Sequence, residues 1–240
     1  MLPSYNEELS LPPLLKRVEE VKSDAVPGLE LLIVNDGSKD GTLTLANAYA
    51  ASHPWVSVLD LQPNRGLAGA MREGLKKAVE GLDDNDIIVT MDADDSHHPG
   101  LIFRMITQIR EGSDLVIASR YRPGSRIVGL APHRKLMSSV AGWLFRIFRP
   151  MKGVRDYTCG YRAYKVSLLR KALDHYQEHF IRQQGFACMA EILIKLKTFH
   201  PVIHELPFIL RYDLKQGDSK MKVWKTVRQT LLMIIQPNRS

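Results

Sequence analysis

The stretch between Ile87 and Pro99 limits the possible folds of this chain more strongly than any other. Its first residues, 87–91, are β-branched or apolar and predict a buried strand. The chain then places the carboxylates of Asp92, Asp94 and Asp95 close together. In an open α/β sheet, ligands bind at the carboxyl ends of the strands, so these side chains are expected at a binding site.

Three neighbouring carboxylates repel one another unless a cation or a hydrogen-bond donor offsets their charge. A hard divalent ion that also contacts phosphate oxygens, Mg²⁺ or Mn²⁺, would do so. The alternative is a solvated acidic loop that connects the strand to a helix opened by Pro99. Taken alone, the stretch leaves both interpretations open.

Strands and helices are expected to alternate along the first half of the chain. Hydrophobic patterning predicts strands at residues 29–34, 56–61, 87–91, 114–119 and 202–210. It predicts helices at residues 14–21, 42–49, 66–79, 101–109 and 134–149, one from 166 and one at 192–196. This alternation is typical of βαβ units and predicts an α/β fold with a mostly parallel sheet.

Polar residues follow three of the predicted strands: Asp36 with Ser38, the pair Asp92 and Asp94, and Arg120. An acidic site with a basic residue nearby is typical of a metal–diphosphate pocket. No G-x-G-x-x-G follows a strand and no G-x-x-x-x-G-K-[ST] occurs, which disfavours a plain dinucleotide-binding protein and a P-loop protein.

Composition is compatible with one large domain, or one domain with an extension, in a chain of 240 residues. The net charge of +7 suits a polyanionic ligand, whether nucleotide, lipid phosphate, anionic membrane or nucleic acid. Cys159 and Cys188 form no metal or disulfide pattern and are expected as buried thiols in a reducing compartment. No apolar run approaches the roughly 18 residues of a membrane span, and no signal peptide precedes the first motif.

Two basic segments have two interpretations each. The predicted helix 134–149 carries Arg and Lys on one face and Trp143 and Phe148 on the other. It is either an interfacial membrane helix or an ordinary core-facing helix with extended Arg side chains. Residues 211–222 contain Arg211, Lys215 and Lys220 and form either a mobile lid over phosphates or a solvated loop.

The two ends of the chain also carry expectations. The polar loop at residues 3–7 follows almost no strand, so the strand before it is expected to be missing or to begin upstream. We expect a single domain over residues 1–225, with an apolar and basic helix or tail over residues 226–240.

Several motifs in this order resemble the family-two inverting glycosyltransferases of the GT-A fold. They are Pro3-Ser4-Tyr5-Asn6-Glu7, Val34-Asn35-Asp36-Gly37-Ser38, and the run from Asp92 to Pro99. The likeness continues at Ser119-Arg120-Tyr121, at residues 160–164, at Gly185-Phe186 with Glu191, and at residues 217–220. Among these enzymes the sequence is most similar to dolichyl- and polyprenyl-phosphate mannose synthases. The resemblance implies a Rossmann-like, mostly parallel sheet flanked by helices.

The resemblance also implies which residues bind a nucleotide sugar. Pro3, Tyr5 and Glu7 would hold the base and ribose, and Val34 and Asp36 would flank the base. In the acidic stretch, Asp92 and Ala93 would contact the ribose and the diphosphate.

By the same resemblance, the metal, Mg²⁺ or Mn²⁺, would be bound by Asp94 and Ser96, with Asp92 as a further candidate ligand. Asp95 stands where such enzymes usually have an apolar residue, which leaves the number of carboxylates on the metal open. Three basic residues would neutralise phosphates of the donor or acceptor: Arg120, Arg211 and Lys220.

The implied reaction is inverting transfer of one sugar, mannose from GDP-mannose, onto a polyprenyl or dolichyl phosphate. Asp94, Arg120 and Glu191 are the candidate catalytic residues, although Glu191 equally fits a structural role. An acceptor phosphate is already an anion, so a strong general base is less necessary. His97 and His98 are expected as supporting groups rather than as the base.

Two alternatives remain at this stage. One keeps the fold and transfers a sugar from UDP-glucose or UDP-GlcNAc to a lipid phosphate or a saccharide, and Asp156 would be its base. The other is a basic nucleic-acid-binding protein, although the basic residues are scattered and no such module is recognisable. The resemblance favours the enzyme, attached peripherally to a membrane on its cytoplasmic side and without a nucleic-acid partner.

Overall fold

The computed structural model describes residues 1–130 and 145–215. Its first half alternates strands and helices, as the patterning predicts. The elements are β1 (Leu2–Ser4), α1 (Leu11–Asp24), β2 (Leu31–Asn35), α2 (Thr42–Ser52), β3 (Val56–Asp60), α3 (Gly66–Ala78), β4 (Ile87–Thr90), α4 (Leu101–Arg110) and β5 (Leu115–Ser119). The later elements are β6 (Arg126–Val128), β7 (Arg162–Lys165), α6 (Val166–Tyr176), α7 (Ala187–Leu196), β8 (Ile203–Pro207) and β9 (Ile209–Arg211), with short 3₁₀ turns at Gln177–His179 and Lys197–Phe199.

The strands form three sheets, and the edges of the two larger ones meet at the first residue. One sheet has the order β1-β2-β3 and is parallel, and the other has the order β4-β7-β5-β8. The amino group of Met1 donates to Val89 O at 2.8 Å, and Met91 N donates to Met1 O at 3.2 Å. Because these bonds follow the parallel ladder pattern, β1 and β4 connect the sheets into one surface. The short strand β1 thus covers the first residues of the segment that the sequence analysis expected as a polar loop at residues 3–7.

Strand β7 is antiparallel to both of its neighbours, β4 and β5, in an otherwise parallel arrangement. Strand β7 was not predicted, because Arg162 lies in it and makes the segment look polar. Arg162 is fully buried, and its guanidinium donates to Met189 O and to Tyr157 O, each at 2.8 Å. These two bonds satisfy part of its hydrogen-bonding capacity and allow a charged residue to lie in a central strand.

The strand predicted at residues 202–210 is two strands. Strand β8 pairs with β5, and β9 pairs in parallel with β6 in a separate two-stranded sheet. At the end of β9, Arg211 N donates to Ser96 O at 2.9 Å. The chain thereby returns to the acidic loop that follows β4.

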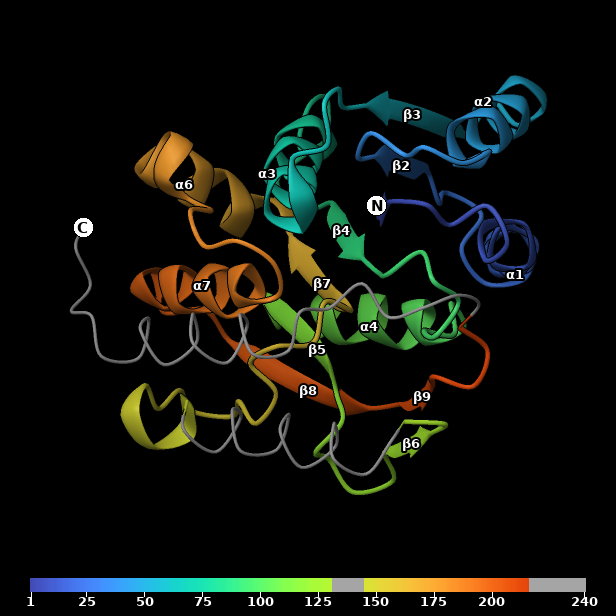
Figure 1. Cartoon of the computed structure of the whole chain (residues 1–240). Helices are drawn as coiled ribbons and strands as arrows, with labels where there is room; N and C mark the ends of the chain where they lie inside the picture. The colour runs from blue at the N-terminus through green and yellow to red at the C-terminus, as the bar shows by residue number, and fades with distance from the viewer. Residues whose placement is uncertain (131–144, 216–240) are drawn as a thin grey trace.

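The helices pack against the faces of the joined sheets. Figure 1 shows β2 between α3 on one side and α1 on the other, with α4 in front of β7 and β5. Val34 and Met1 pack so tightly on α3 that a Cβ added at Gly74 would lie 2.9 Å from Val34 Cγ2. Among the helices in residues 1–130 and 145–215, none is both long and apolar enough to cross a bilayer.

Candidate active site

The loops after β1 and β2 are joined by hydrogen bonds into one unit. Asn6 N donates to Ser38 Oγ at 3.0 Å, and Lys39 N donates to Asn6 Oδ1 at 2.8 Å. Glu7 N donates to Thr42 Oγ1 at 2.7 Å. The two segments that the resemblance assigns to the nucleotide therefore lie together at the carboxyl ends of neighbouring strands.

Asp36 is held beside the loop that follows β3. Its Oδ1 accepts a hydrogen bond from Arg65 N at 2.7 Å, and Asn64 Nδ2 donates to Asp36 O at 2.6 Å. Gly37 has φ +63°, and a Cβ there would lie 2.7 Å from Asn64 N, so glycine is required for both its backbone angle and this close approach. Burial raises the pKa of Asp36 and the hydrogen bond from Arg65 opposes the shift.

Asp94 is the best-supported carboxylate of the acidic loop. Ser96 donates to Asp94 Oδ1 through both its hydroxyl (2.6 Å) and its backbone N–H (3.1 Å). The ammonium of Lys215 donates to Asp94 Oδ2 at 2.6 Å. Burial acts to raise the pKa of Asp94, but the charge of Lys215 and these hydrogen bonds outweigh it and lower the pKa. Asp94 is therefore kept ionised.

Asp92 lies on the other side of the same loop. Its backbone N–H donates to His97 Nδ1 at 3.3 Å, and His97 stacks on Tyr161 with ring centroids 5.2 Å apart. Gly160 approaches so closely that a Cβ there would lie 3.1 Å from Asp92 Oδ1. Burial raises the pKa of Asp92, and the charge of Asp94 adds to the increase. His97 thus supports the loop that carries Asp92, in line with the expectation from the sequence.

Asp95 is turned away from this pair. It has φ +63°, a left-handed conformation that Asp tolerates better than most residues. Its carboxylate forms an ion pair with Arg17 of α1, and only 6% of its side chain is exposed. This contact gives the acidic residue at an otherwise apolar position a partner, and it leaves Asp92 and Asp94 as the two carboxylates available to a cation.

Arg120 is engaged in a buried ion pair with Asp156. Its Nε and Nη2 donate to the two Asp156 oxygens at 2.8 and 2.7 Å, and Nη2 also donates to Thr158 Oγ1. Burial would lower the pKa of Arg120, but Asp156 raises it. The charge of Arg120 acts weakly to lower the pKa of Asp92, but the direct partner of the guanidinium is Asp156.

Asp156 is the residue named above as the base of the alternative enzyme. It is fully buried and also accepts hydrogen bonds from Arg120 N and Cys159 N. Burial alone would raise its pKa, but Arg120 and these bonds hold the pKa below its usual value. A carboxylate stabilised in its charged form by this many donors is a weak base, so the contacts disfavour that role.

Glu191 serves the loop in front of α7. Its Oε2 accepts from Arg182 N at 2.8 Å and from Gln183 N at 2.7 Å, and its Oε1 accepts from Lys195 Nζ at 2.7 Å. These contacts favour the structural interpretation of Glu191 over the catalytic one.

Replacing Glu191 separates these two roles. We expect Glu191→Ala to lower the free energy of unfolding by about 1–3 kcal/mol, because two partly buried backbone N–H groups lose their acceptor. Glu191→Gln still offers an oxygen acceptor and is expected to keep kcat within a few-fold of the parent. The measurement pairs urea unfolding with steady-state kinetics. A glutamine variant as inactive as the alanine variant, but stably folded, would assign chemistry to this carboxylate.

The other predicted site residues are placed as follows. Val34 and Ala93 are buried, so their side chains belong to the core and only their backbones are left for a ligand. Arg211 is beside Ser96 through its backbone, while its guanidinium pairs with Asp213 at 2.8 Å. Lys220 and most of the predicted helix 134–149 lie outside the described residues, as does the tail 226–240.

Sequence reasoning assigned Lys215 to a basic loop without a specific partner, and it gave no signal for Arg17. The positions of both depend on contacts between distant segments. Lys215 follows β9, whose end is fixed to Ser96, and Arg17 lies on α1 beside the acidic loop. Nothing in the residues from Arg211 to Lys215 indicates that Lys215 pairs with Asp94.

The chemistry of the acidic loop fits a divalent metal bound together with a diphosphate. Mg²⁺ is commonly held by one or two carboxylates plus phosphate oxygens rather than by a full protein cage. Asp92 and Asp94 provide two carboxylates, and no cluster of three or more His, Cys, Asp or Glu side chains suited to a metal occurs in residues 1–130 and 145–215. The remaining ligands would then come from the substrate.

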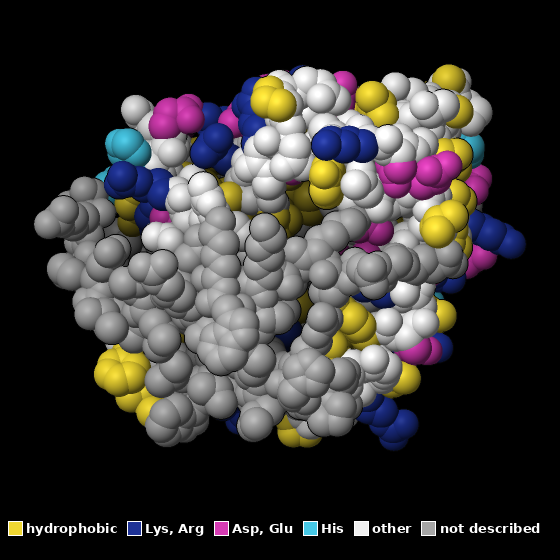
Figure 2. All heavy atoms as spheres, in the orientation of Figure 1, with side chains coloured by type: hydrophobic (Ala, Val, Ile, Leu, Met, Phe, Trp, Pro, Cys, Tyr) yellow, Lys and Arg dark blue, Asp and Glu magenta, His cyan; other side chains and the backbone are white. Residues whose placement is uncertain are grey.

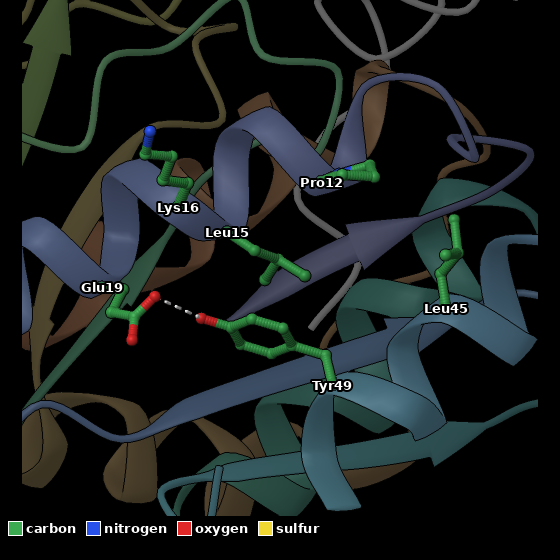
Figure 3. Close-up of a pocket in the computed structure, with 6 residues that line it drawn as sticks. All are labelled: Pro12, Leu15, Lys16, Glu19, Leu45 and Tyr49. Carbon is green, nitrogen blue, oxygen red and sulfur yellow. Dashed lines mark hydrogen bonds between the residues drawn. The ribbon is translucent and has the colours of Figure 1, made fainter. Parts of the chain in front are cut away.

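A separate hollow of about 210 Å³ lies between α1 and α2. Figure 3 shows that its lining includes Leu15, Leu45 and Tyr49, with Tyr49 Oη donating to Glu19 Oε2 at 3.4 Å. The hollow is lined from the two helices rather than from the loops at the strand ends, and it contains none of the acidic-loop residues. We assign it no part in the reaction.

The comparisons with known proteins assign the fold to a family. The chain belongs to glycosyl transferase family 2, because the model of that family matches residues 1–173. Among solved structures, glucosyl-3-phosphoglycerate synthase from Mycobacterium tuberculosis, in complex with Mn²⁺, UDP and glucosyl-3-phosphoglycerate, matches 97% of this chain and 77% of its own with a TM-score of 0.67. Its sequence identity is 19%, so the match shows the GT-A fold alone.

Curated relatives are more similar in sequence. The undecaprenyl-phosphate mannosyltransferase of Micrococcus luteus is 36% identical over 92% of this chain and 86% of its own length. The dolichol-phosphate mannosyltransferase of Pyrococcus furiosus is 33% identical over 92% of this chain and 58% of its own. The polyprenol monophosphomannose synthase of Mycolicibacterium smegmatis is 36% identical over 71% of this chain and 62% of its own. The chain thus spans less than two thirds of the last two relatives.

Proposed function

We propose that this chain transfers mannose from GDP-mannose to a polyprenyl phosphate, with inversion at the sugar carbon and with Mg²⁺ or Mn²⁺. The observation that carries the proposal is the pair Asp92 and Asp94 at the carboxyl end of β4, supported by Ser96 and placed beside the loops after β1 and β2. The similarity to polyprenyl-phosphate mannosyltransferases over most of the chain supports the choice of sugar and acceptor.

The residues of the site have distinct tasks in this reaction. Asp94 and Asp92 would hold the metal, and Ser96 orients Asp94. When bound, the metal supplies positive charge that stabilises the departing diphosphate. Asp36 and Glu7, on the joined loops, would bind the base and ribose. The acceptor phosphate is an anion at neutral pH and attacks the sugar carbon without losing a proton, which agrees with the engaged states of Asp156 and Glu191.

A donor screen tests the proposal. Each reaction contains the protein, polyprenyl phosphate, Mn²⁺ and one donor: GDP-mannose, UDP-glucose or UDP-GlcNAc. The lipid-linked sugar formed in each reaction is measured. We expect lipid product from GDP-mannose alone, and its loss when the metal is chelated. Product from a UDP-sugar would support the proposed transfer reaction but would refute GDP-mannose as the donor. Metal-dependent nucleotide binding with no lipid product from any donor would move the acceptor to a saccharide.

We also infer that the enzyme works at a membrane surface, because its acceptor is a lipid. Ile147 and Phe148, in the helical residues 145–148, are 48% and 59% exposed. Figure 2 shows hydrophobic side chains exposed at the lower left, where Figure 1 places this helical turn. Arg146 and Arg149 flank the two apolar residues, and this combination of apolar and basic groups suits an anionic interface.

Replacing both apolar residues by serine tests this placement. We expect Ile147→Ser with Phe148→Ser to weaken binding to vesicles containing anionic lipid by at least about tenfold, because less apolar area enters the interface. Phe103→Ser is the matched control, since Phe103 is 51% exposed and lies on α4. Sedimentation with vesicles gives the affinities. Equal binding by the double variant and the control would show that residues 147 and 148 do not contact the membrane.

A further inference from the structure

Lys215 occupies the side of Asp94 that a metal would need. Its ammonium lies 2.6 Å from Asp94 Oδ2, and the exposed fractions of the two side chains are 13% and 10%. Asp94 Oδ1 is already used by the Ser96 hydroxyl and N–H. Both oxygens of the central carboxylate are therefore engaged, one by a neutral donor residue and the other by a cation.

Backbone hydrogen bonds of residues 211–214 hold Lys215 beside Asp94. Arg211 N donates to Ser96 O at 2.9 Å, Tyr212 N donates to Val128 O at 2.9 Å, and Leu214 N donates to Arg211 O at 3.1 Å. Gly129, with φ +79°, lies so close that a Cβ there would be 2.5 Å from Asp213 N. The backbone before Lys215 is thus anchored to both β6 and the acidic loop, and the Lys215 side chain extends from it to Asp94.

The electrostatic surroundings of Lys215 connect two parts of the site. Burial acts to lower its pKa, but the carboxylates of Asp94 and Glu7 outweigh that effect and raise it. The ammonium also lies 5.5 Å from the centre of the Tyr212 ring, at cation–π distance. Its contact with Asp94 and its position over Tyr212 fix the Lys215 ammonium at the acidic loop.

We propose that Lys215 is the counter-ion of Asp94 in the unloaded enzyme and that it exchanges with the metal. When metal and nucleotide sugar bind, the ammonium leaves Asp94 Oδ2 and pairs instead with the diphosphate. The inference rests on the proposed function for the existence of a metal–diphosphate complex, and it adds a positioning residue that competes with the metal before the donor arrives.

Charge balance gives the exchange its direction. A sugar diphosphate carries two negative charges and meets two more on Asp92 and Asp94. Lys215 alone would leave this group strongly negative, whereas a divalent ion together with Lys215 offsets most of it. Without donor, the same lysine disfavours metal binding, because a metal on Asp94 would lie beside an ammonium that has lost its partner. Lys215 therefore makes metal binding depend on the diphosphate.

Mn²⁺ binding in the absence of substrate tests the exchange. We expect Lys215→Met to bind Mn²⁺ about five- to tenfold more tightly than the parent protein, measured by electron paramagnetic resonance, because a competing cation is removed. Lys215→Arg keeps the charge and is expected to stay near the parent affinity. Lys77→Met is the matched control, since Lys77 forms an exposed ion pair with Glu80 and its loss changes the net charge equally. Lys215→Gln repeats the test if the methionine variant fails to fold.

A second measurement, of GDP affinity, tests whether the Lys215 ammonium pairs with the diphosphate. At saturating Mn²⁺, Lys215→Met is expected to bind GDP about five- to tenfold more weakly and to leave guanosine binding unchanged. Unchanged or weaker Mn²⁺ affinity in the neutral variants, or an equal loss of affinity for GDP and guanosine, would refute the exchange.

These binding measurements do not depend on the identity of the sugar or the acceptor. A protein inactive with GDP-mannose whose neutral variants still bind Mn²⁺ more tightly would refute the proposed function and keep this inference.

Discussion

Asp94→Ala is expected to lower mannosyl transfer by at least about 10³-fold, because it removes the carboxylate that holds the metal against the departing diphosphate. The fold should be retained. Asp94 lies in a loop, and its replacement removes hydrogen bonds from Lys215 and Ser96 but no side chain of the hydrophobic core. The measurement is lipid-linked product formed per unit time with saturating Mn²⁺, together with a circular dichroism spectrum of the variant.

The neighbouring carboxylate provides the control. Asp95→Asn removes a charge from the same loop but keeps a residue that tolerates the left-handed conformation at φ +63°. Because Asp95 pairs with Arg17 rather than with the metal site, we expect this variant to retain most of its transfer rate. Full activity of Asp94→Ala with the metal chelated, or an equal loss in both variants, would contradict the assignment.

The largest effect on stability is expected at Asp156. Asp156→Ala leaves the guanidinium of Arg120 buried without its carboxylate, and breaking a buried ion pair in this way costs about 3–5 kcal/mol. A typical domain is stable by about 5–15 kcal/mol, so this loss is a large fraction of the total. Urea unfolding gives the free energy of unfolding directly. Asp84→Ala breaks a solvent-exposed pair with Arg170 and is expected to cost less than about 1 kcal/mol.

The pH dependence of the same measurement identifies the cause. Because folding lowers the pKa of Asp156 below its usual 3.8, the ion pair contributes its full stability at higher pH and loses it as the pH falls through the folded-state pKa. The difference in stability between the parent and Asp156→Asn should therefore narrow in acid below about pH 4. A constant difference across this range would mean that the asparagine acts through packing alone.

The regular part of the fold could be predicted because local patterns and tertiary structure agree there. β2, β3 and β5 are apolar runs bounded by turns, and α1, α3 and α4 carry apolar residues at helical spacing. Strand β7 was missed because Arg162 makes the segment look polar, and one of its buried partners, Met189 O, lies 27 residues further along the chain. The division of residues 202–210 between β8 and β9 was missed because it depends on which neighbouring strand each half pairs with.

The site divides in the same way. Residue types and their order were enough to find Asp36, Asp92 and Asp94 at the ends of strands. They did not give the direction of each side chain: Asp95 turns to Arg17, Arg120 pairs with Asp156, and Glu191 holds the backbone before α7. Nor did they reveal Lys215, which is 121 positions after its partner Asp94. Such pairings depend on how loops meet in space, which the residue order does not specify.

The most direct test of the central claim is a crystal structure of the protein with Mn²⁺ and GDP. We expect Mn²⁺ bonded to an Asp94 oxygen and to the diphosphate, with the Lys215 ammonium moved from its present 2.6 Å contact with Asp94 Oδ2 onto a phosphate oxygen. A diphosphate bound with Lys215 still on Asp94 and no metal between them, or Mn²⁺ held by other residues, would contradict it.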